Sequence, residues 1–435
     1  MTKKLLLPEE GFIAFDLLIN GRKIKDSIAI QEIYIEMEVN RITSATITIH
    51  NQGISSNEHL ENSESSDFVP GNEIEISLGY NTKFDKVFKG IVISQRLSVN
   101  ENGSQLIVVC SDKAINMTKG RFNSIFQNKK DSEALKSITS KYNLKLDIDS
   151  TPEEHPVLMQ YNCTDWDYLV IRAEANNMLV HSYQNILSIK KMDFSKDPSI
   201  EINTQNVNEV DLNLESTNLA GAYKMTTWDS KTQETVTNSV KIKDSLSQGN
   251  LTATKLSETI KNAKEDYVPV GIQENEMKVW GESQANRAAL NKIKGKIIIQ
   301  GTAKIRAGDL IKLSGFGTRF NGTAFISKVE HIVHDGVWIT ELSIGISSKL
   351  HASLPDIEGI GASGLTPAIR GTQIAVVKKT YEDPENNYRV LVTLPTLKGT
   401  GQEDGIWARM VFPYASSDAG YFFFPEVGDE VLLSF

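Results

Sequence analysis

Residues 30–50 read IQEIYIEMEVNRITSATITIH, and this stretch decides the class of the fold. Apolar side chains occupy every second position in two successive runs, which are Ile33, Ile35, Met37 and Val39, then Ala45, Ile47 and Ile49. Successive side chains of a strand point to opposite faces, so a period of two is typical of strands that bury one face. The stretch therefore predicts two neighbouring half-buried strands.

Much of the remaining chain repeats this alternation or carries short apolar runs of strand length. These runs cover residues 12–19, 74–78, 87–93, 106–109, 297–299, 310–313, 324–329 and 337–344. Dipeptides that tolerate the positive φ of tight hairpins stand between runs, namely Asn20-Gly21, Asn102-Gly103, Asn321-Gly322 and Asp335-Gly336. Hairpins join antiparallel strands, and many of them at short spacing are typical of barrels or sandwiches. The predicted fold class is mainly β.

Helical patterns are few. Residues 131–142 carry an apolar stripe, with Asp131 or Ser132 as the predicted cap. Residues 164–177 begin at Thr164 with a loose capping-box arrangement. Two further helices are predicted at residues 252–264 and 280–294. The first two helices lie close together between β-rich stretches, which predicts a small α/β insertion.

The clearest domain boundary is the linker over residues 351–372, which is rich in glycine and proline and has no hydrophobic periodicity. Two polar stretches, residues 53–66 and 230–249, are predicted to be linkers or exposed loops. The predicted domains are a first β-barrel over residues 1–120, the α/β insertion over 121–195, a second β-barrel with helical segments over 196–350, the linker over 351–372 and an OB-like domain over 373–435.

The OB-like domain is predicted from five strand-like runs, at residues 373–381, 388–394, 406–412, 421–424 and 430–435. Five short strands at this spacing are typical of a small Greek-key barrel. The last run contains Leu432 and ends at Phe435, so it would form an exposed apolar edge strand. We expect further residues or partner chains to cover that edge.

Composition excludes several classes of protein. Apolar residues make up 40% of the 435 and charged residues 23%, which is typical of a globular chain. No run reaches the roughly 18 apolar residues of a membrane span, and Pro8 ends the first apolar run too early for a signal peptide. We therefore expect cytoplasmic synthesis and no stable membrane insertion. The net charge of −9 argues against nucleic-acid binding, and Cys110 and Cys163 are expected to be free, packed thiols.

No motif in the sequence predicts a catalytic site, a metal or a cofactor. His331 and His334 would point to opposite faces of a strand, and Asp335-Gly336 is typical of a hairpin turn. Acidic pairs stand at Asp165/Asp167, Glu153/Glu154 and Glu73/Glu75, but nothing marks a cleft around them. The first pair begins a helix, where acidic side chains favour the dipole, and the last is expected on the wet face of a strand.

The C-terminal segment carries the most specific family signal. Trp407-Ala408-Arg409-Met410-Val411-Phe412-Pro413 precedes Gly420–Pro425, which precedes Val427-Gly428-Asp429-Glu430-Val431-Leu432. This order resembles the OB-like needle base of VgrG-type spike proteins. The resemblance selects five needle-base residues, Trp407, Arg409, Pro425, Gly428 and Asp429. Locally, Pro425 and Gly428-Asp429 are also expected to build a tight turn.

Weaker segments upstream follow in the same order as in the phage-type hub of that family. They include residues 68–72, 87–92, 111–123, 161–180, 308–313, 322–331 and 338–340. The hub residues that this resemblance selects are Pro70, Gly71, Gly90, Trp166, Gly322 and Trp338.

The resemblance implies a homotrimer in which each chain contributes two related barrels. The resulting pseudo-six-fold ring docks on a six-fold tube, and the C-terminal part begins a three-fold needle. Sheath and baseplate components surround such a hub, while a PAAR-like tip protein and effectors travel with the needle. The assembled machine ejects the protein toward a target cell or carries it in an extracellular particle. This sequence departs from the family pattern because these 435 residues contain neither the long β-helical needle nor the lysozyme domain.

Two other functions remain open at this stage. The carboxylates are compatible with a cell-wall hydrolase of a phage tail, and a β-rich chain is compatible with a glycan-binding tail adhesin. Phe422-Phe423-Phe424 is either an exposed binding patch or a barrel wall that also packs on neighbouring chains. A structural hub without enzymatic activity is the leading hypothesis.

Overall fold

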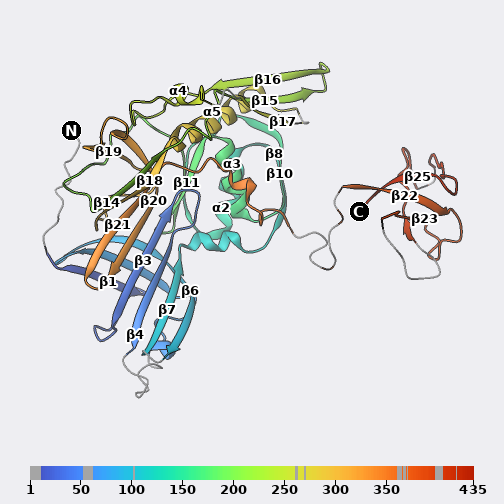
Figure 1. Cartoon of the computed structure of the whole chain (residues 1–435). Coiled ribbons are helices and arrows are strands. Elements are labelled where there is room, and N and C mark those ends of the chain that lie inside the picture. The colour runs from blue at the N-terminus through green and yellow to red at the C-terminus, as the bar shows by residue number, and fades with distance from the viewer. Residues whose placement is uncertain are drawn as a thin grey trace. The chain divides into compact units, whose positions relative to one another are not determined.

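The computed structural model describes residues 11–51, 62–100, 103–259, 263–268, 271–359, 365, 369, 371–396, 405–417 and 419–435. The chain divides into two compact units, Met1–Glu358 and Gly359–Phe435, here called the first unit and the terminal unit. Strands dominate both units (Figure 1), so the predicted mainly-β class is confirmed. Of the described helices, none combines the length and apolar composition that crossing a membrane requires.

A 13-stranded sheet organises the first unit, in the order β14-β18-β21-β20-β3-β4-β7-β6-β5-β1-β2, with β13 and β19 attached through β20. Its N-terminal strands are β1 (Ile13–Ile19), β2 (Arg22–Lys23), β3 (Ile30–Glu38), β4 (Ser44–Asn51), β5 (Glu73–Tyr80), β6 (Lys83–Asn100) and β7 (Gly103–Ser111). The later strands are β13 (Ile200–Asn203), β14 (Glu209–Leu214), β18 (Ile293–Gln300), β19 (Leu310–Ser314), β20 (Gly322–His334) and β21 (Val337–Ile344).

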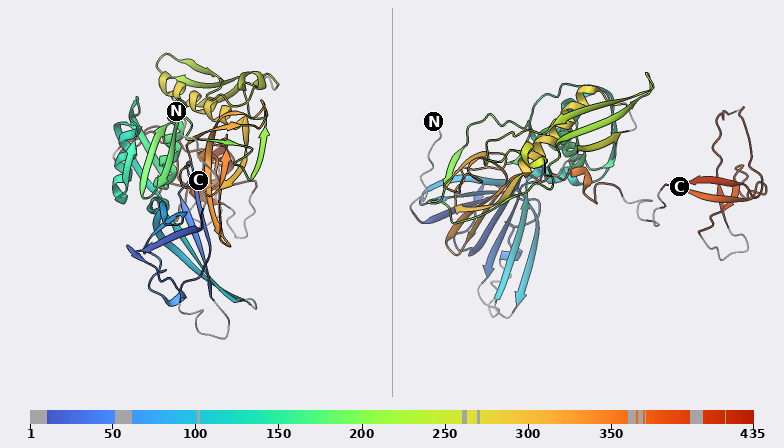
Figure 2. Two further views of the ribbon diagram at one scale, coloured as in Figure 1. Left: turned by 90° about the vertical axis from the view of Figure 1, so that its left-hand side faces the viewer. Right: turned by 45° about the horizontal axis from the view of Figure 1, so that its top comes forward.

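Antiparallel pairing of β3 with β20 joins the strands of the two predicted barrels into this one sheet. Figures 1 and 2 show the blue N-terminal strands beside the orange late strands. Two of the predicted turns are tight hairpins with positive φ, at Asn20-Gly21 and Asp335-Gly336. The two strands predicted from residues 30–50 are β3 and β4, which pair with each other.

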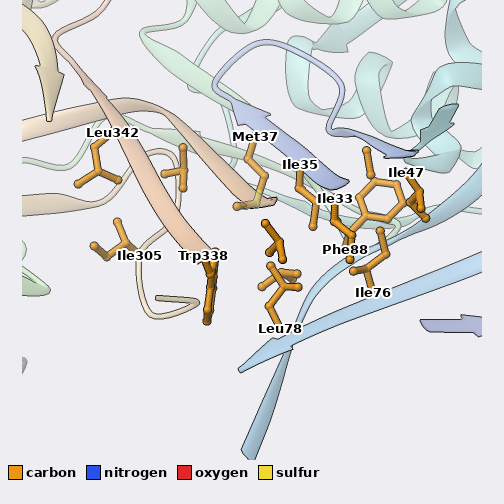
Figure 3. Close-up of a cluster of buried hydrophobic side chains, with 14 of the residues drawn as sticks. Ile33, Ile35, Met37, Ile47, Ile76, Leu78, Phe88, Ile305, Trp338 and Leu342 are labelled. Atoms are coloured by element: carbon orange, nitrogen blue, oxygen red, sulfur yellow. The ribbon is translucent and has the colours of Figure 1, made fainter. Parts of the chain in front are cut away.

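One hydrophobic core spans both groups of strands (Figure 3). It contains Ile33, Ile35 and Ile47 from the early strands and Leu342 from the late ones, all fully buried. These are the alternating positions that the sequence pattern selects, and their opposite neighbours are polar. The shared core means that the early and late strands bury their apolar faces together.

The α/β insertion packs helices on two small sheets around a second core. Its helical elements are η1 (Lys113–Thr118), α2 (Asp131–Thr139), η2 (Ser140–Tyr142) and α3 (Asp165–Ala175). Its strands are β8 (Phe122–Lys130), β9 (Lys145–Ile148), β10 (Glu154–Cys163), β11 (Met178–Tyr183) and β12 (Ile186–Lys191). The predicted cap of α3 is confirmed, because the Thr164 hydroxyl accepts from the Asp167 backbone N–H. The helix α2 begins at Asp131 as predicted, but the predicted cap is wrong: the N-cap is Lys130, and the Asp131 side chain binds Arg172 and Asn176 instead.

After the insertion, the first unit contains a three-stranded sheet, β16-β15-β17, beside a long helix (Figure 2). Its elements are β15 (Ala222–Asp229), β16 (Glu234–Lys241), α4 (Ala253–Ser257), β17 (Ala263–Val268) and α5 (Glu274–Asn291). Three expectations are corrected here. The helix predicted at 252–264 is only the short α4, α5 begins before residue 280, and β16 occupies part of the loop predicted at 230–249. Most of the loop predicted at 53–66 lies outside the described residues.

The terminal unit contains a four-stranded sheet in the order β24-β23-β22-β25. Its strands are β22 (Thr372–Lys379), β23 (Val390–Thr393), β24 (Ile406–Ala408) and β25 (Glu430–Ser434). A small core contains Ala375, Val377, Val390, Val392 and Leu394. The prediction of a fifth strand at residues 421–424 is wrong for the described chain, because that segment has no strand partner. Among the residues that the structure describes, β22 is the next regular element after η3 (His351–Ser353) in the first unit.

Candidate functional site

A buried ion pair lies where several parts of the first unit meet. Nη1 of Arg287, from α5, is 3.1 Å from Oε1 of Glu174, from α3, and both side chains are 4% exposed. The same carboxylate accepts hydrogen bonds from the Asn40 side-chain amide at 2.9 Å and the His351 backbone N–H at 2.8 Å. Burial lowers the pKa of Arg287, and the nearby carboxylate opposes that shift. A buried charge is tolerated only with such compensation, so this junction depends on every partner being present.

The segment after β21 is held to the first unit through its main chain. We call residues 346–357 the exit strap, because they are the last part of the first unit before the chain leaves for the terminal unit. Nη2 of Arg287 donates to the carbonyls of Ser347 at 3.0 Å and Lys349 at 3.1 Å, and Asn291 donates to that of Ile346 at 2.6 Å. Side chains of α5 therefore fix the start of the strap.

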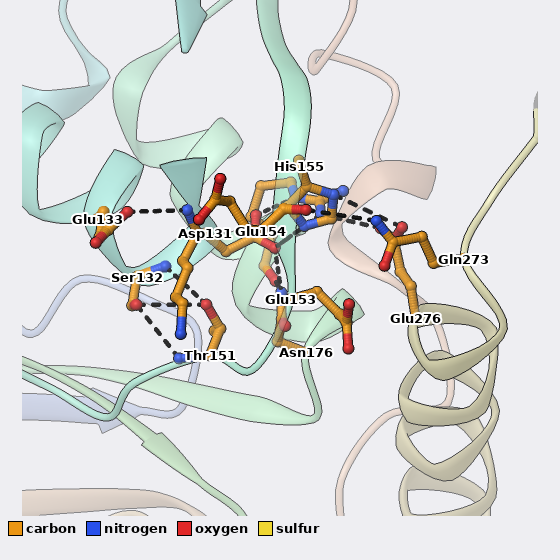
Figure 4. A network of polar contacts seen from close by, with 12 residues as sticks. Asp131, Ser132, Glu133, Thr151, Glu153, Glu154, His155, Asn176, Gln273 and Glu276 are labelled. Carbon is orange, nitrogen blue, oxygen red and sulfur yellow. Dashed lines mark hydrogen bonds and ion pairs between the residues drawn. The ribbon is translucent and has the colours of Figure 1, made fainter. Parts of the chain in front are cut away.

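A second polar network ties the insertion to α5 (Figure 4). Asp131 is 1% exposed and accepts from Arg172 Nε at 2.6 Å, from Arg172 Nη2 at 2.9 Å and from Asn176 at 2.9 Å. The His155 ring lies 3.0 Å from the same carboxylate, and Arg172 also reaches Glu276 of α5 at 3.2 Å. Burial alone would raise the pKa of Asp131, but the bonds from Arg172 outweigh it and hold the pKa below its usual value.

Trp338, which the sequence selects as a hub residue, lies in the shared core. Its ring is stacked on Tyr80 of β5 at 5.4 Å between centroids, and His331 of β20 lies 5.8 Å away. The Tyr80 hydroxyl donates to the carbonyl of Gly301 at 3.0 Å, and a Cβ on Gly301 would lie 2.1 Å from the indole. Trp338 thus packs an early strand against late ones. Trp166 is buried separately, in the core of the insertion.

The selected hub glycines occupy positions where a side chain would not fit or would strain the backbone. A Cβ on Gly90 would lie 2.2 Å from the backbone oxygen of Ser111, and one on Gly322, at φ +120°, would lie 1.9 Å from that of Ser247. Gly71 has a φ of +104° in the exposed turn after Pro70. Gly90 and Gly322 therefore allow two strands of the first unit to approach neighbouring backbone closely.

The needle-base residues lie around one turn and one strand of the terminal unit. Gly428 has a φ of +99°, and its N–H donates to the Val377 carbonyl at 2.9 Å. Asp429 accepts from the Glu426 backbone N–H at 2.8 Å, which closes the turn before β25. Pro425 is half-buried next to it. Trp407 is half-buried in β24, and Arg409 follows that strand, exposed.

The terminal unit presents a cluster of aromatic rings, here called the aromatic face. It consists of Phe412, Tyr414, Tyr421, Phe422, Phe423 and Phe424, whose rings contact one another at centroid distances of 4.8–6.5 Å. Phe423 is 74% exposed, and Leu432 on the outer side of β25 is 75% exposed. Apolar side chains in such number on a small unit are typical of a surface that another chain covers.

Two of the three carboxylate pairs, Asp165/Asp167 and Glu73/Glu75, are engaged in structural bonds. Asp165 accepts from Tyr142 at 2.7 Å, from Gln160 at 2.7 Å and from Lys141 at 3.1 Å. Hydrogen bonds from Lys86 and Lys89 lower the pKa of Glu75, and Glu73 is paired with Lys113. A general acid needs a raised pKa, so the lowered pKa values of Glu73 and Glu75 disfavour that role.

His331 and His334 have different environments. His331 is 1% exposed, and its Nδ1 lies 3.1 Å from the Thr340 hydroxyl, while His334 is at the exposed end of β20 beside Asp335. Burial lowers the pKa of His331 to about 4, which keeps its ring neutral. The two cysteines are both free and buried, as the sequence predicts.

Sequence reasoning did not single out Glu174 or Arg287. One signal was available, because Arg287 stands among the small residues Ala285, Ala288 and Ala289 on a helix. Small neighbours leave room for a long charged side chain to lie along a buried face. Glu174, the partner of Arg287, is 113 positions away in the sequence, so the pair could not be predicted without the tertiary packing.

Comparison with known proteins follows the division into units. Residues 9–335 match the family model described as the Alg8 N-terminal domain. Residues 373–435 match the model described as the type VI secretion system/phage-baseplate injector OB domain, which agrees with the predicted OB-like domain. No curated protein matches the sequence significantly.

Solved structures of phage tail proteins share the fold. The 43 kDa tail protein of prophage MuSo2 from Shewanella oneidensis is 12% identical, with a TM-score of 0.57 over 77% of this chain and 99% of that one. The tail protein from Neisseria meningitidis MC58 is 13% identical, with a TM-score of 0.57 over 80% and 100%. By the match over residues 9–335 the chain belongs to the Alg8 N-terminal domain family, and its last residues match the injector OB domain, in line with the predicted resemblance to VgrG-type spike and phage hub proteins.

Proposed function

We propose that three copies of this chain assemble into the hub and needle base of a contractile injection system. In that role the first units form a ring that docks on a six-fold tube, and the terminal units begin a three-fold needle. Baseplate and sheath components, a tip protein and effectors are the proposed partners. The protein would be made and assembled in the cytoplasm and then ejected or released in an extracellular particle.

The observation that carries the proposal is the aromatic face together with the exposed side of β25. A unit of this size buries a small core of its own, and small domains usually gain stability from further contacts such as oligomerisation. Three copies around an axis would remove the exposed rings and Leu432 from water at the same time. The match to an injector OB domain and the fold shared with tail proteins support the same assembly.

The proposed activity is mechanical and needs no chemistry by the protein. Of the carboxylates considered for a hydrolase, Asp165, Asp167, Glu73 and Glu75 are engaged in structural bonds, and the lowered pKa values of Glu75 and Asp167 would make them poor proton donors. Two ionic contacts instead connect the insertion to α5, Glu174 with Arg287 and Arg172 with Glu276. A part that transmits force needs slow unfolding, which cross-linking interactions of this kind favour.

Native mass spectrometry of the full chain tests the proposal. We expect a species of three times the 48.3 kDa chain mass, and we expect the double change Phe423→Ser with Leu432→Ser to shift it to the monomer. Tyr267→Ser is the matched control, because Tyr267 is 71% exposed on β17, outside the aromatic face. A wild-type chain that remains monomeric at micromolar concentration would contradict the proposal.

A further inference from the structure

The exit strap is anchored in two parts that differ in burial. The inner part, residues 346–351, carries the backbone bonds to Arg287, Asn291 and Glu174, and His351 is 8% exposed. The outer part, residues 352–357, depends on Arg121, which lies at the surface between η1 and β8. Two parts with different partners can separate one after the other.

Arg121 binds two carbonyl oxygens of the outer part and a third in β10. Nη1 donates to the carbonyls of Asn162 and Ile357, and Nη2 donates to that of Asp356, each at 2.7 Å. A planar guanidinium suits such divergent acceptors, whereas an ammonium group is a single point of charge. The Arg121 guanidinium is therefore the principal polar contact between the outer part and the rest of the first unit.

Space remains beneath the outer part, although Ile357 at its end is only 9% exposed. A cavity of about 600 Å³ lies there, lined among others by Trp166, Leu354 and Ile357. The His351 ring, which contacts Asp167 at 2.9 Å, lines the same cavity. The two parts differ in their polar anchors, because Arg287, Asn291 and Glu174 are buried whereas Arg121 is exposed. Burial alone would raise the pKa of Asp167, but the bonds from His351 and Thr164 hold it below its usual value.

We infer that the exit strap is a two-stage tether, in which the outer part detaches from Arg121 while the inner part stays bound to the first unit. Detachment of residues 352–357 adds six residues to the span between the first unit and β22. At about 3.3–3.6 Å per extended residue, this is roughly 20 Å of extra reach. The first unit can thus lengthen its connection to the terminal unit without unfolding. The inference concerns the single chain and does not depend on the proposed trimer.

Hydrogen exchange of the full-length protein tests the tether. The N–H groups of Leu354 and Ile357 report on the outer part, and that of His351 reports on the inner part. Arg121→Ala should speed exchange in residues 352–357 by about 10- to 100-fold, the effect expected from losing charge-assisted hydrogen bonds, and should leave residues 346–351 unchanged. Arg121→Lys should give an intermediate rate.

Lys119→Ala is the matched control, because it removes an exposed positive charge two residues away that makes no bond to the strap. It should leave both parts of the strap unchanged. Unchanged exchange in residues 352–357 of Arg121→Ala would overturn the inference, and so would equal acceleration of the two parts. Unchanged protection of β22 and β3 in each variant verifies that both units remain folded.

Discussion

Glu174→Gln would leave the Arg287 guanidinium buried beside a neutral amide. The amide oxygen can still accept from Asn40, but the His351 N–H would face either that oxygen or an amide nitrogen that cannot accept. Breaking a buried pair by neutralising one partner costs about 3–5 kcal/mol, because the remaining charge stays uncompensated in a site that is 4% exposed. We therefore expect the free energy of unfolding of the first unit to fall by about that amount.

Urea unfolding of the full chain, followed by circular dichroism, measures this change. The double variant Glu174→Gln/Arg287→Met removes both charges and should lose less than the sum of the two single variants, with a remaining cost of about 1–2 kcal/mol from the freed strap carbonyls. Lys278→Met, an exposed cation on the same helix, is the control and should change stability by less than about 0.5 kcal/mol. A loss below about 1 kcal/mol for Glu174→Gln, or strict additivity in the double variant, would refute the reasoning.

Three further predictions concern single sites. His331 has a folded pKa of about 4, below the ordinary value of about 6.5, so its contribution to the free energy of unfolding is complete above pH 6.5. About 3 kcal/mol of that free energy is lost as the pH falls to 4. Urea unfolding at a series of pH values should therefore show a flatter pH dependence for His331→Leu. Gly90→Ala should destabilise the first unit by about 1–3 kcal/mol in urea, because its Cβ meets the Ser111 backbone. Gly428→Val should raise hydrogen exchange in β22 and β25 and leave β3 protected, since a β-branched residue is strained at a φ of +99°.

The sequence predicted the strands best where one face is buried against a continuous core. Ile33 and Ile35 show the alternation clearly because β3 lies in the middle of the sheet with one polar face. The helix α3 was also predictable, because Thr164 supplies a capping hydroxyl. Both features are local, so the chemistry of a few neighbouring residues suffices to indicate them.

The errors have physical reasons of a different kind. The start of α5 was missed because its N-cap, Gln273, makes no side-chain capping bond. The strand β16 was taken for a loop because its apolar residues are few, although Val236 and Val240 alternate with polar neighbours along it. The run Tyr421–Phe424 has the composition of a strand, but no neighbouring strand pairs with it in the described chain. Such outcomes depend on partners elsewhere in the chain.

Pairing of β3 with β20 has a consequence for how the protein is made. The side chains of Tyr34 and Glu330 contact each other across this pair, although 296 positions separate them. At about 5–20 residues per second, a ribosome needs roughly 15–60 s to synthesise that interval. During this time the hydrogen-bonding edge of β3 lacks its native neighbour and can join the wrong strand. The edge of β3 therefore stays unpaired until β20, residues 322–334, has been synthesised.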